Sequence, residues 1–275
     1  MKKLHTNPMN EGSEPLPIKE MGEDKYRIAE GLNKSLLVPF MQSPFHYKHE
    51  LENKKQPTEN MKLGTALHAE LLLPRPSDVY AVCKKVDKRK TEGKEYFAQF
   101  TAENVGKTVI DEDQYESLKG MKEGLYRNAF SRRILEQATD REVAMFGTRN
   151  CEHGKVRLKG MADIYDSNNG ILADIKTVDS ATKDSFKWAM KDFSYDIQQV
   201  HYTWLAINAG LPFSKFMFIV CERKKPWATA VYQLSTDSYM KAFDRWSKAL
   251  DYFSHCQERN DFESSYPEEA VEISI

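Results

Sequence analysis

Three things are scarce in this sequence of 275 residues: cysteine, long apolar runs and net charge. Its four cysteines are scattered singly, without a C-x-x-C pair, which argues against a disulfide framework, an iron–sulfur cluster and a zinc site. No stretch approaches the roughly 18 consecutive apolar residues of a membrane span, and residues 1–8 lack the apolar core of a signal peptide. We therefore expect a cytoplasmic protein without a membrane partner.

The formal net charge is −1, which taken alone speaks against a basic nucleic-acid-binding domain. The average hides an acidic tail, because residues 258–275 hold six acids and one arginine, a net charge of −5. Subtracting −5 from −1 leaves +4 for residues 1–257. The neutral total therefore excludes little. The tail could mimic DNA, dock a partner or aid solubility, and we favour solubility.

Composition divides the chain into a body with two polar ends. Residues 1–30 carry three prolines and no apolar period, so we expect a flexible N-terminal segment. Residues 31–257 should form one domain, because a chain of this length with 40% hydrophobic residues can bury a real core. Residues 258–275 are the acidic tail.

Apolar periodicity and capping residues predict a helix from about residue 33 that restarts after Pro44, then helices over 58–73 with Thr58 as N-cap and over 111–137, 195–208 and 236–257. Alternating apolar residues predict strands over 142–146, 160–166, 171–178, 216–221 and 229–233. Residues 84–107 are charged and mixed, which favours a loop plus a short helix. This order predicts a mixed α/β fold, with a central mixed β-sheet flanked by helices.

Two predicted strands form a hairpin around the turn Ser167–Gly170, since Asn and Gly tolerate the positive φ of tight turns. With this turn, the numbers of paired residues sum to 337, which places Asp163 opposite Asp174 on one face of the sheet. Strand alternation returns Lys176 to the same face. The opposite face of the second strand is apolar and should be core (Ile171, Ala173, Ile175).

Like charges directly across two strands destabilise a hairpin, so something must offset the repulsion between the two aspartates. A divalent cation does so, and hard oxygen ligands suit Mg²⁺ or Mn²⁺. The alternative is an aspartate pair that faces solvent, and Asp-x-Lys alone is a common tripeptide. The coincidence of two acids and a lysine on one face favours a metal-dependent site.

Four blocks, in this order along the chain, resemble the PD-(D/E)XK nucleases of the RecB-like branch, and within it the RecE exonuclease family. They are Leu32–Leu37 with Ser43–Tyr47, Leu63–His68 as G-x-x-x-H, Gly160–Asp163 with Asp174–Thr177 as G-x-x-D and D-x-K-T, and Gln198–Tyr202 as Q-x-x-x-Y. Ala162 replaces the proline of the superfamily's name, and Asp174 stands where many members have Glu. The resemblance implies a restriction-endonuclease-like core.

The resemblance also implies roles for individual residues. Asp163, Asp174, the carbonyl of Ile175 and His68 would hold the metal, and Lys176 would orient or deprotonate the attacking water. Gln198 and Tyr202 would hold the scissile phosphate or an end base. Among the remaining matched positions, the serines Ser35 and Ser43 would contact DNA.

The residues themselves leave other readings open. His68 lies among leucines, where a histidine is more often a core residue, although Gly64 one turn earlier would let another backbone approach closely. Gln198 and Tyr202 also suit an ordinary amphipathic helix with buried Ile197, Val200 and Trp204. Glu142 could add a carboxylate to the site, whereas His46 and His49 suit a surface position.

DNA contact requires cations along a groove, and three runs offer them. They are Lys84, Lys85, Lys88, Arg89 and Lys90; then Arg132 and Arg133; then Arg223, Lys224 and Lys225. Each run suits a solvated face equally well. Contacts of this kind would bind phosphates without reading sequence.

From the resemblance we expect a Mg²⁺-dependent exonuclease that degrades linear duplex DNA from the 5′ end and leaves a 3′ single strand. The family further implies a ring-shaped homo-oligomer, a RecT-like single-strand annealing protein as partner, and a phage or prophage origin. One alternative is a structure-specific or endonucleolytic member of the same superfamily. Another is a non-catalytic module that kept the fold to bind DNA or protein.

Overall fold

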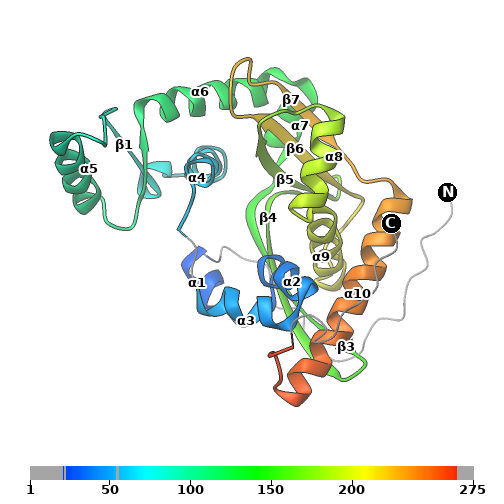
Figure 1. The fold of residues 1–275 in the computed structure, drawn as a ribbon. Coiled ribbons are helices and arrows are strands. Elements are labelled where there is room, and N and C mark those ends of the chain that lie inside the picture. The colour runs from blue at the N-terminus through cyan, green and yellow to red at the C-terminus, as the bar shows by residue number, and fades with distance from the viewer. Residues whose placement is uncertain (1–20, 22, 54–55, 265–275) are drawn as a thin grey trace, which may run out of the picture.

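A five-stranded mixed sheet forms the centre of the molecule in the computed structural model, which describes residues 21, 23–53 and 56–264 (Figure 1). The strands lie in the order β3 (Asp140–Cys151), β4 (Gly154–Asp166), β5 (Ile171–Val178), β6 (Lys215–Glu222) and β7 (Thr229–Tyr232). β5 and β6 are parallel, and the other neighbours are antiparallel. The expected mixed α/β fold is confirmed.

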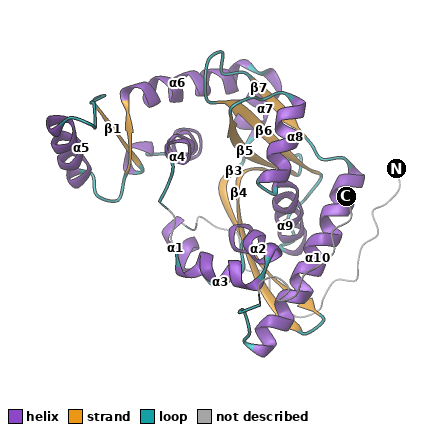
Figure 2. Ribbon diagram, in the orientation of Figure 1, coloured by secondary structure: helices purple, strands orange, loops and turns teal. Residues whose placement is uncertain are grey.

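Helices cover both faces of the sheet (Figure 2). One apolar core joins the sheet to α2 (Lys34–Gln42), α8 (Lys183–Asp192), α9 (Tyr195–Asn208) and α10 (Thr236–Arg259). A second core joins it to α4 (Glu59–Leu72), α6 (Glu112–Arg127) and α7 (Ala129–Gln137). Along β5, Leu172 packs in the first core and Ala173 and Ile175 in the second, because successive side chains of a strand point to opposite faces.

A smaller unit lies at the far end of α6, at the left of Figure 1. It contains the parallel strands β1 (Tyr80–Cys83) and β2 (Thr108–Asp111), preceded by a 3₁₀ turn over Pro76–Asp78, with α5 (Thr91–Glu103) between the strands in sequence. We expected only a loop and a short helix over residues 84–107, whereas α5 alone has 13 residues. Strands of four residues were missed because they offer too few alternations to reveal a period.

Two helix boundaries are set by side-chain caps. The helix expected over residues 111–137 is broken at Asn128, whose Oδ1 accepts hydrogen bonds from the amides of Phe130 and Ser131 and so begins α7. Ser43 begins α3 (Pro44–Glu52) in the same way, with its Oγ accepting the amide of His46. The expected restart of the helical pattern after Pro44 is confirmed by α3, whereas periodicity did not predict the break at Asn128 and also missed α8.

Part of the expected flexible lead-in is folded. Residues Glu23–Ile28 form α1, and the ammonium of buried Lys159 on β4 donates hydrogen bonds to carbonyls at its C-terminal end (Tyr26, Arg27 and Ala29). The expectation of flexibility is therefore wrong for residues 23–30, and residues 1–20 lie outside the described part.

The beginning of the acidic tail is folded as well. α10 continues to Arg259, and the ring of Phe262 packs against Phe40, Tyr47 and Phe253. Residues 265–275 of the predicted tail lie outside the described residues. Within the described part of the chain, no helix has the length and apolar composition to cross a membrane.

Candidate metal centre of a nuclease fold

The β4–β5 hairpin has the predicted register. Ile164 pairs with Ala173 and Tyr165 with Leu172, so the numbers of paired residues sum to 337 as expected. The turn is closed by Gly170, which has a φ of 64°, and by the carboxylate of Asp166, which accepts hydrogen bonds from two turn amides. Turn chemistry therefore set the register, and the two remaining aspartates come next along the strands.

The two strands part at Asp163 and Asp174, since the paired positions end at Ile164 and Ala173. The amide of Ile175 donates a hydrogen bond of 2.6 Å to Asp163 Oδ2 instead of to a strand carbonyl. On the other side of β4, Glu142 has a positive φ of 51° between two regularly paired positions of β3. Asp163 thus lies where the sheet is distorted on both sides, and its side chain fills the gap.

Asp174 is held from two directions. It is 3% exposed, Lys176 Nζ lies 2.5 Å from its Oδ2, and the side-chain amide of Gln198 on α9 donates a hydrogen bond to its Oδ1. Asp174 and Lys176 therefore share a face of the sheet, as strand alternation predicts. Gln198 is itself 5% exposed, so its amide is committed to this contact.

His68 approaches from the opposite helical layer. Its Nδ1 lies 3.4 Å from Asp163 Oδ1, its Nε2 lies 3.2 Å from the carbonyl oxygen of Ile175, and one third of its side chain is exposed. His68 is therefore not a core histidine. The reason expected for Gly64 is wrong, because an added Cβ would meet only Thr177 Oγ1 at an ordinary 3.7 Å.

The charges at this site oppose one another. Burial, and then the carboxylate of Asp174, raise the pKa of Asp163 to about 6, against the opposite effects of His68, Lys176 and the Ile175 amide. Burial disfavours the ammonium of Lys176, but the acids, Asp174 first, outweigh it and raise its pKa. Two carboxylates confined around one lysine leave an excess of negative charge, which a divalent cation would offset.

The donor set fits a hard divalent cation. The Asp163 carboxylate, the carbonyl of Ile175 and the imidazole of His68 meet at the gap, and the Asp174 carboxylate is near enough to raise the pKa of Asp163. Buried Asp174 Oδ2 makes no well-directed hydrogen bond beside its ion pair with Lys176. The ligand atoms of His68, Asp163 and Asp174 do not all lie within 4.8 Å of one another, since Lys176 and Gln198 hold Asp174. Within the described residues, the three side chains whose ligand atoms do lie within 4.8 Å of one another are elsewhere in the fold: His153, His255 and Glu258.

Sequence reasoning missed Lys34 and Tyr195. Lys34 Nζ at the start of α2 donates a hydrogen bond of 2.5 Å to the carbonyl of Phe193 and lies 5.4 Å from the Tyr195 ring centroid, while Lys176 Nζ lies 4.6 Å from the same ring. Burial, and then repulsion from Lys176, lower the pKa of Lys34 to about 8. Lys34 lies within a matched block, but no spacing rule singles out one lysine on a helix.

Three further residues of the matched blocks, Tyr202, Ser35 and Ser43, differ in how far they are exposed. Tyr202 packs its ring on β4, where an added Cβ at Gly160 would come within 2.8 Å of it, and burial raises its pKa well above the ordinary range. Ser35 is exposed, whereas Ser43 is 4% exposed and caps α3. The expected DNA contact by Ser43 is therefore wrong, because its hydroxyl is used within the fold.

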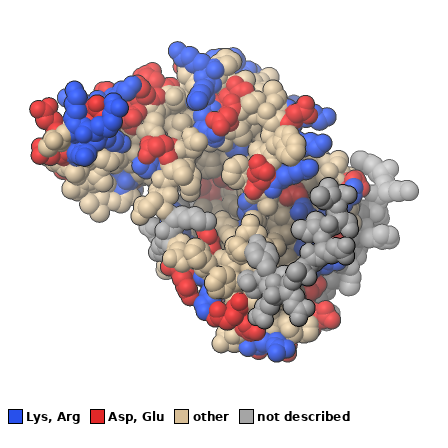
Figure 3. Space-filling model, in the orientation of Figure 1, with Lys and Arg blue, Asp and Glu red and all other residues tan. Residues whose placement is uncertain are grey.

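The three basic runs lie in different parts of the molecule. Residues 84–90 precede α5, Arg132 and Arg133 are exposed on α7, and Lys224 and Lys225 are exposed in the β6–β7 connection. Several of these cations have local partners, such as Asp113 for Lys85 and Asp179 for Arg223. On the face drawn in Figure 3, basic and acidic side chains intermingle, so this face shows no continuous basic groove.

Residues 33–271 match the family described as a PDDEXK-like domain of unknown function, DUF3799. The chain belongs to this family. The mixed five-stranded sheet agrees with this description, and the expected PD-(D/E)XK core is confirmed. A nuclease-like fold of this kind indicates a hydrolase that acts on nucleic acid, and PD-(D/E)XK nucleases typically use divalent metal ions.

One solved structure supports the fold. A candidate exonuclease from Eubacterium rectale matches with a TM-score of 0.61 at 13% identity, over 90% of this chain and 89% of that one. A phage-related exonuclease from Haemophilus somnus 129PT covers 78% of this chain and 100% of its own at 13% identity, but its TM-score of 0.33 carries no weight. A search of the curated proteins finds no match.

Proposed function

We propose that this protein is a Mg²⁺-dependent deoxyribonuclease of RecE type, which degrades linear duplex DNA from the 5′ end and leaves a 3′ single strand. The observation that carries the proposal is the meeting of Asp163, Asp174 and Lys176 where β4 and β5 part, with His68 and Gln198 reaching them from opposite helical layers. Mn²⁺ would also suit a donor set that includes an imidazole.

In this proposal Asp163, Asp174, the Ile175 carbonyl and His68 would hold the metal, which would supply Lewis-acid chemistry for activating water and for neutralising negative charge on the leaving group. Lys176, whose ammonium form is favoured by the acids around it, orients the attacking water, and its charge stabilises the extra negative charge of the transition state. Gln198 fixes the orientation of Asp174 through its hydrogen bond. Tyr202, one turn further along α9, would steady the scissile phosphate or an end base.

The RecE-type details rest on the four sequence blocks. Polarity, preference for duplex ends, a ring-shaped oligomer and a RecT-like annealing partner all follow from that resemblance. The two rivals are an endonucleolytic or structure-specific enzyme with the same site, and a module that binds DNA or protein without cutting. The intact set of two aspartates and a lysine favours an enzyme over the binding module.

The test uses the purified chain with Mg²⁺, linear duplex labelled at either end, and covalently closed circles. We expect loss of the 5′ label first, survival of the closed circles, and at least a hundredfold slower digestion by Asp174→Asn, because the metal sites of hydrolases supply several kcal/mol. Exposed Asp184 on α8 gives the matched control, and Asp184→Asn should digest like the parent. Cleavage of closed circles would favour the endonuclease. Linear duplex that stays undigested would refute the proposal of nuclease activity.

A further inference from the structure

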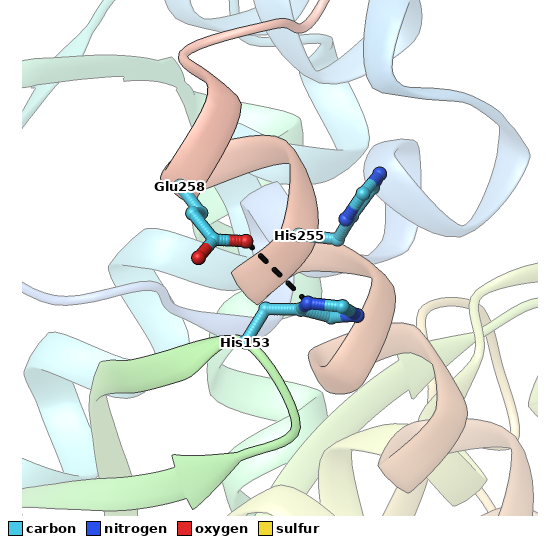
Figure 4. Close-up of side chains that lie close together, drawn as sticks. All are labelled: His153, His255 and Glu258. Atoms are coloured by element: carbon cyan, nitrogen blue, oxygen red, sulfur yellow. Dashed lines mark ion pairs between the residues drawn. The ribbon is translucent and has the colours of Figure 1, made fainter.

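We propose that His153, His255 and Glu258 form a second metal site, one that takes Zn²⁺ and clips the β3–β4 turn to the C-terminal end of α10. Among the described residues, this is the trio of His, Cys, Asp or Glu side chains whose ligand atoms all lie within 4.8 Å of one another. Figure 4 shows His153 on the turn beside His255 and Glu258 on the helix. The site contains no cysteine, so the absence of C-x-x-C does not exclude it.

The distances suit a tetrahedral metal. Zinc–nitrogen and zinc–oxygen bonds of about 2.0–2.2 Å place neighbouring ligand atoms of a tetrahedron about 3.4 Å apart. His153 Nδ1 and Glu258 Oε2 are separated by 3.4 Å, with the side chains turned toward one another (Figure 4). The ligand nitrogen of His255 lies within 4.8 Å of both other ligand atoms, which is at most about 1.4 Å more than the tetrahedral spacing.

The third ligand is available. Nδ1 of His255 is buried and makes no hydrogen bond within the described structure. A buried polar atom without a partner is costly, so a ligand that uses it would be stabilising. The His255 ring is also restrained, because it lies 4.6 Å from the ring of His153 and stacks at 6.5 Å on Tyr252.

The turn that carries His153 is fixed to α10 before any metal binds. The amide of His153 donates to Ser254 Oγ at 3.2 Å, and the amide of Glu152 donates to Asp251 Oδ1 at 3.3 Å. A site whose supporting backbone is already in place loses little entropy on binding. The nearby cation Lys248 is paired with Asp244 at 2.9 Å, which reduces its repulsion of a metal.

The donor set distinguishes this site from the proposed catalytic centre. Two imidazoles and one carboxylate are a set that zinc takes in proteins, with a fourth position left for water, whereas Mg²⁺ prefers oxygen ligands. Zinc here would join two elements far apart in sequence, at the end of α10 that leads into the packed ring of Phe262. Excess Mg²⁺ should therefore saturate the catalytic centre without blocking the zinc site.

The experiment titrates ZnCl₂ by calorimetry into the chelator-treated full chain in excess Mg²⁺, with Co²⁺ absorption as a probe of tetrahedral geometry. We expect one equivalent bound, unchanged in the Asp163→Asn/Asp174→Asn variant, and at least tenfold weaker binding by His153→Gln and by the exposed Glu258→Gln. Zinc should also raise the Tm of the parent and not that of these variants. Exposed His49 supplies the control, since His49→Gln should bind zinc like the parent.

Two results would overturn the proposal. One is zinc binding that is lost with the aspartates and kept by His153→Gln and Glu258→Gln. The other is no bound equivalent in the parent, which would leave His153 and Glu258 as an ion pair only. Glu258 is 59% exposed, so its variant tests the site without threatening the fold.

Discussion

Replacing Asp163 by Asn should stabilise the protein while abolishing cleavage. With Asp163 ionised, its carboxylate is buried close to that of Asp174, and their repulsion outweighs the attraction of the Asp163 carboxylate to His68 and Lys176. The pKa of Asp163 is raised to about 6, which is about two units above that of an unfolded chain. Two units correspond to about 3 kcal/mol at neutral pH as an upper limit. Because Asn can still accept the hydrogen bond from Ile175, we expect a gain of about 1–3 kcal/mol.

The assay is urea unfolding of parent and Asp163→Asn in EDTA, because a divalent cation would offset the repulsion. A raised carboxyl pKa means that the folded state binds the proton more tightly than the unfolded state. The destabilisation is therefore complete above about pH 6 and disappears as the pH falls toward about 4. The advantage of Asp163→Asn should follow the same window and vanish at about pH 4.

Asp166 in the same hairpin provides the matched control. Its oxygens accept from the amides of Asn168 and Asn169 and from the Asn169 side chain, and it is 1% exposed. In Asp166→Asn the side-chain amide would point its own N–H group at these N–H donors. The free energy of unfolding should therefore fall by about 1–3 kcal/mol. If Asp163→Asn is destabilised at pH 7.5 as much as Asp166→Asn, then Asp163 is a structural acid and the electrostatic account of the site is refuted.

Three further outcomes are expected. Burial lowers the pKa of His201 to about 4, so below about pH 6.5 the unfolded state binds a proton that the folded state does not, and the free energy of unfolding falls. Between pH 7 and pH 5 the parent should lose about 2 kcal/mol more of this free energy than His201→Gln, as measured by urea titration. Gly124→Ala should lower the free energy of unfolding by about 1–3 kcal/mol in the same assay, because its Cβ would lie 2.2 Å from the carbonyl oxygen of Trp227. Gly64→Ala, whose Cβ has room, should raise it by up to about 1 kcal/mol through the higher helix propensity of alanine. Lys159→Met should speed amide exchange in α1 by about tenfold or more, the equivalent of a charged hydrogen bond of about 1.5 kcal/mol.

Elements whose signals are local could be predicted from the sequence. The β4–β5 register follows from a turn and two alternating strands within about 15 residues, and α9 begins at Tyr195 and ends at Asn208 as predicted. Non-local elements were missed. β1 and β2 pair across the whole of α5, and Asn128 interrupts a run whose apolar period continues on both sides. α8 has only ten residues and buries a single one, Phe186, so its period is diluted in the windows of about 11–18 residues that reveal a helix.

The residues of the candidate site also differ in whether their signals are local in the sequence. Asp174 and Lys176 lie two residues apart on one strand, so their common face could be worked out from the pleat. The gap at Asp163 could not, because a regular alternating pattern gives no sign that the strands part there. His68 and Gln198 come from helices of opposite layers, and their convergence depends on how those helices pack. Periodicity alone favoured a core position for His68, and only the resemblance to a family pointed to the site. Lys34 was named by neither, because its role depends on the Phe193 carbonyl 159 residues away.

The gap between β4 and β5 shows that the site also completes the sheet. Where the strands part, Ile175 loses its backbone partner, and two side chains take over: Asp163 accepts its amide and His68 faces its carbonyl oxygen. An orphaned backbone donor costs about 1–3 kcal/mol when buried. Asp163→Ala should therefore lose most of the stability that Asp163→Asn gains, although both remove the same charge and both should be inactive. Equal stability of the two variants in urea would mean that water satisfies the Ile175 amide and that the carboxylate serves the chemistry alone.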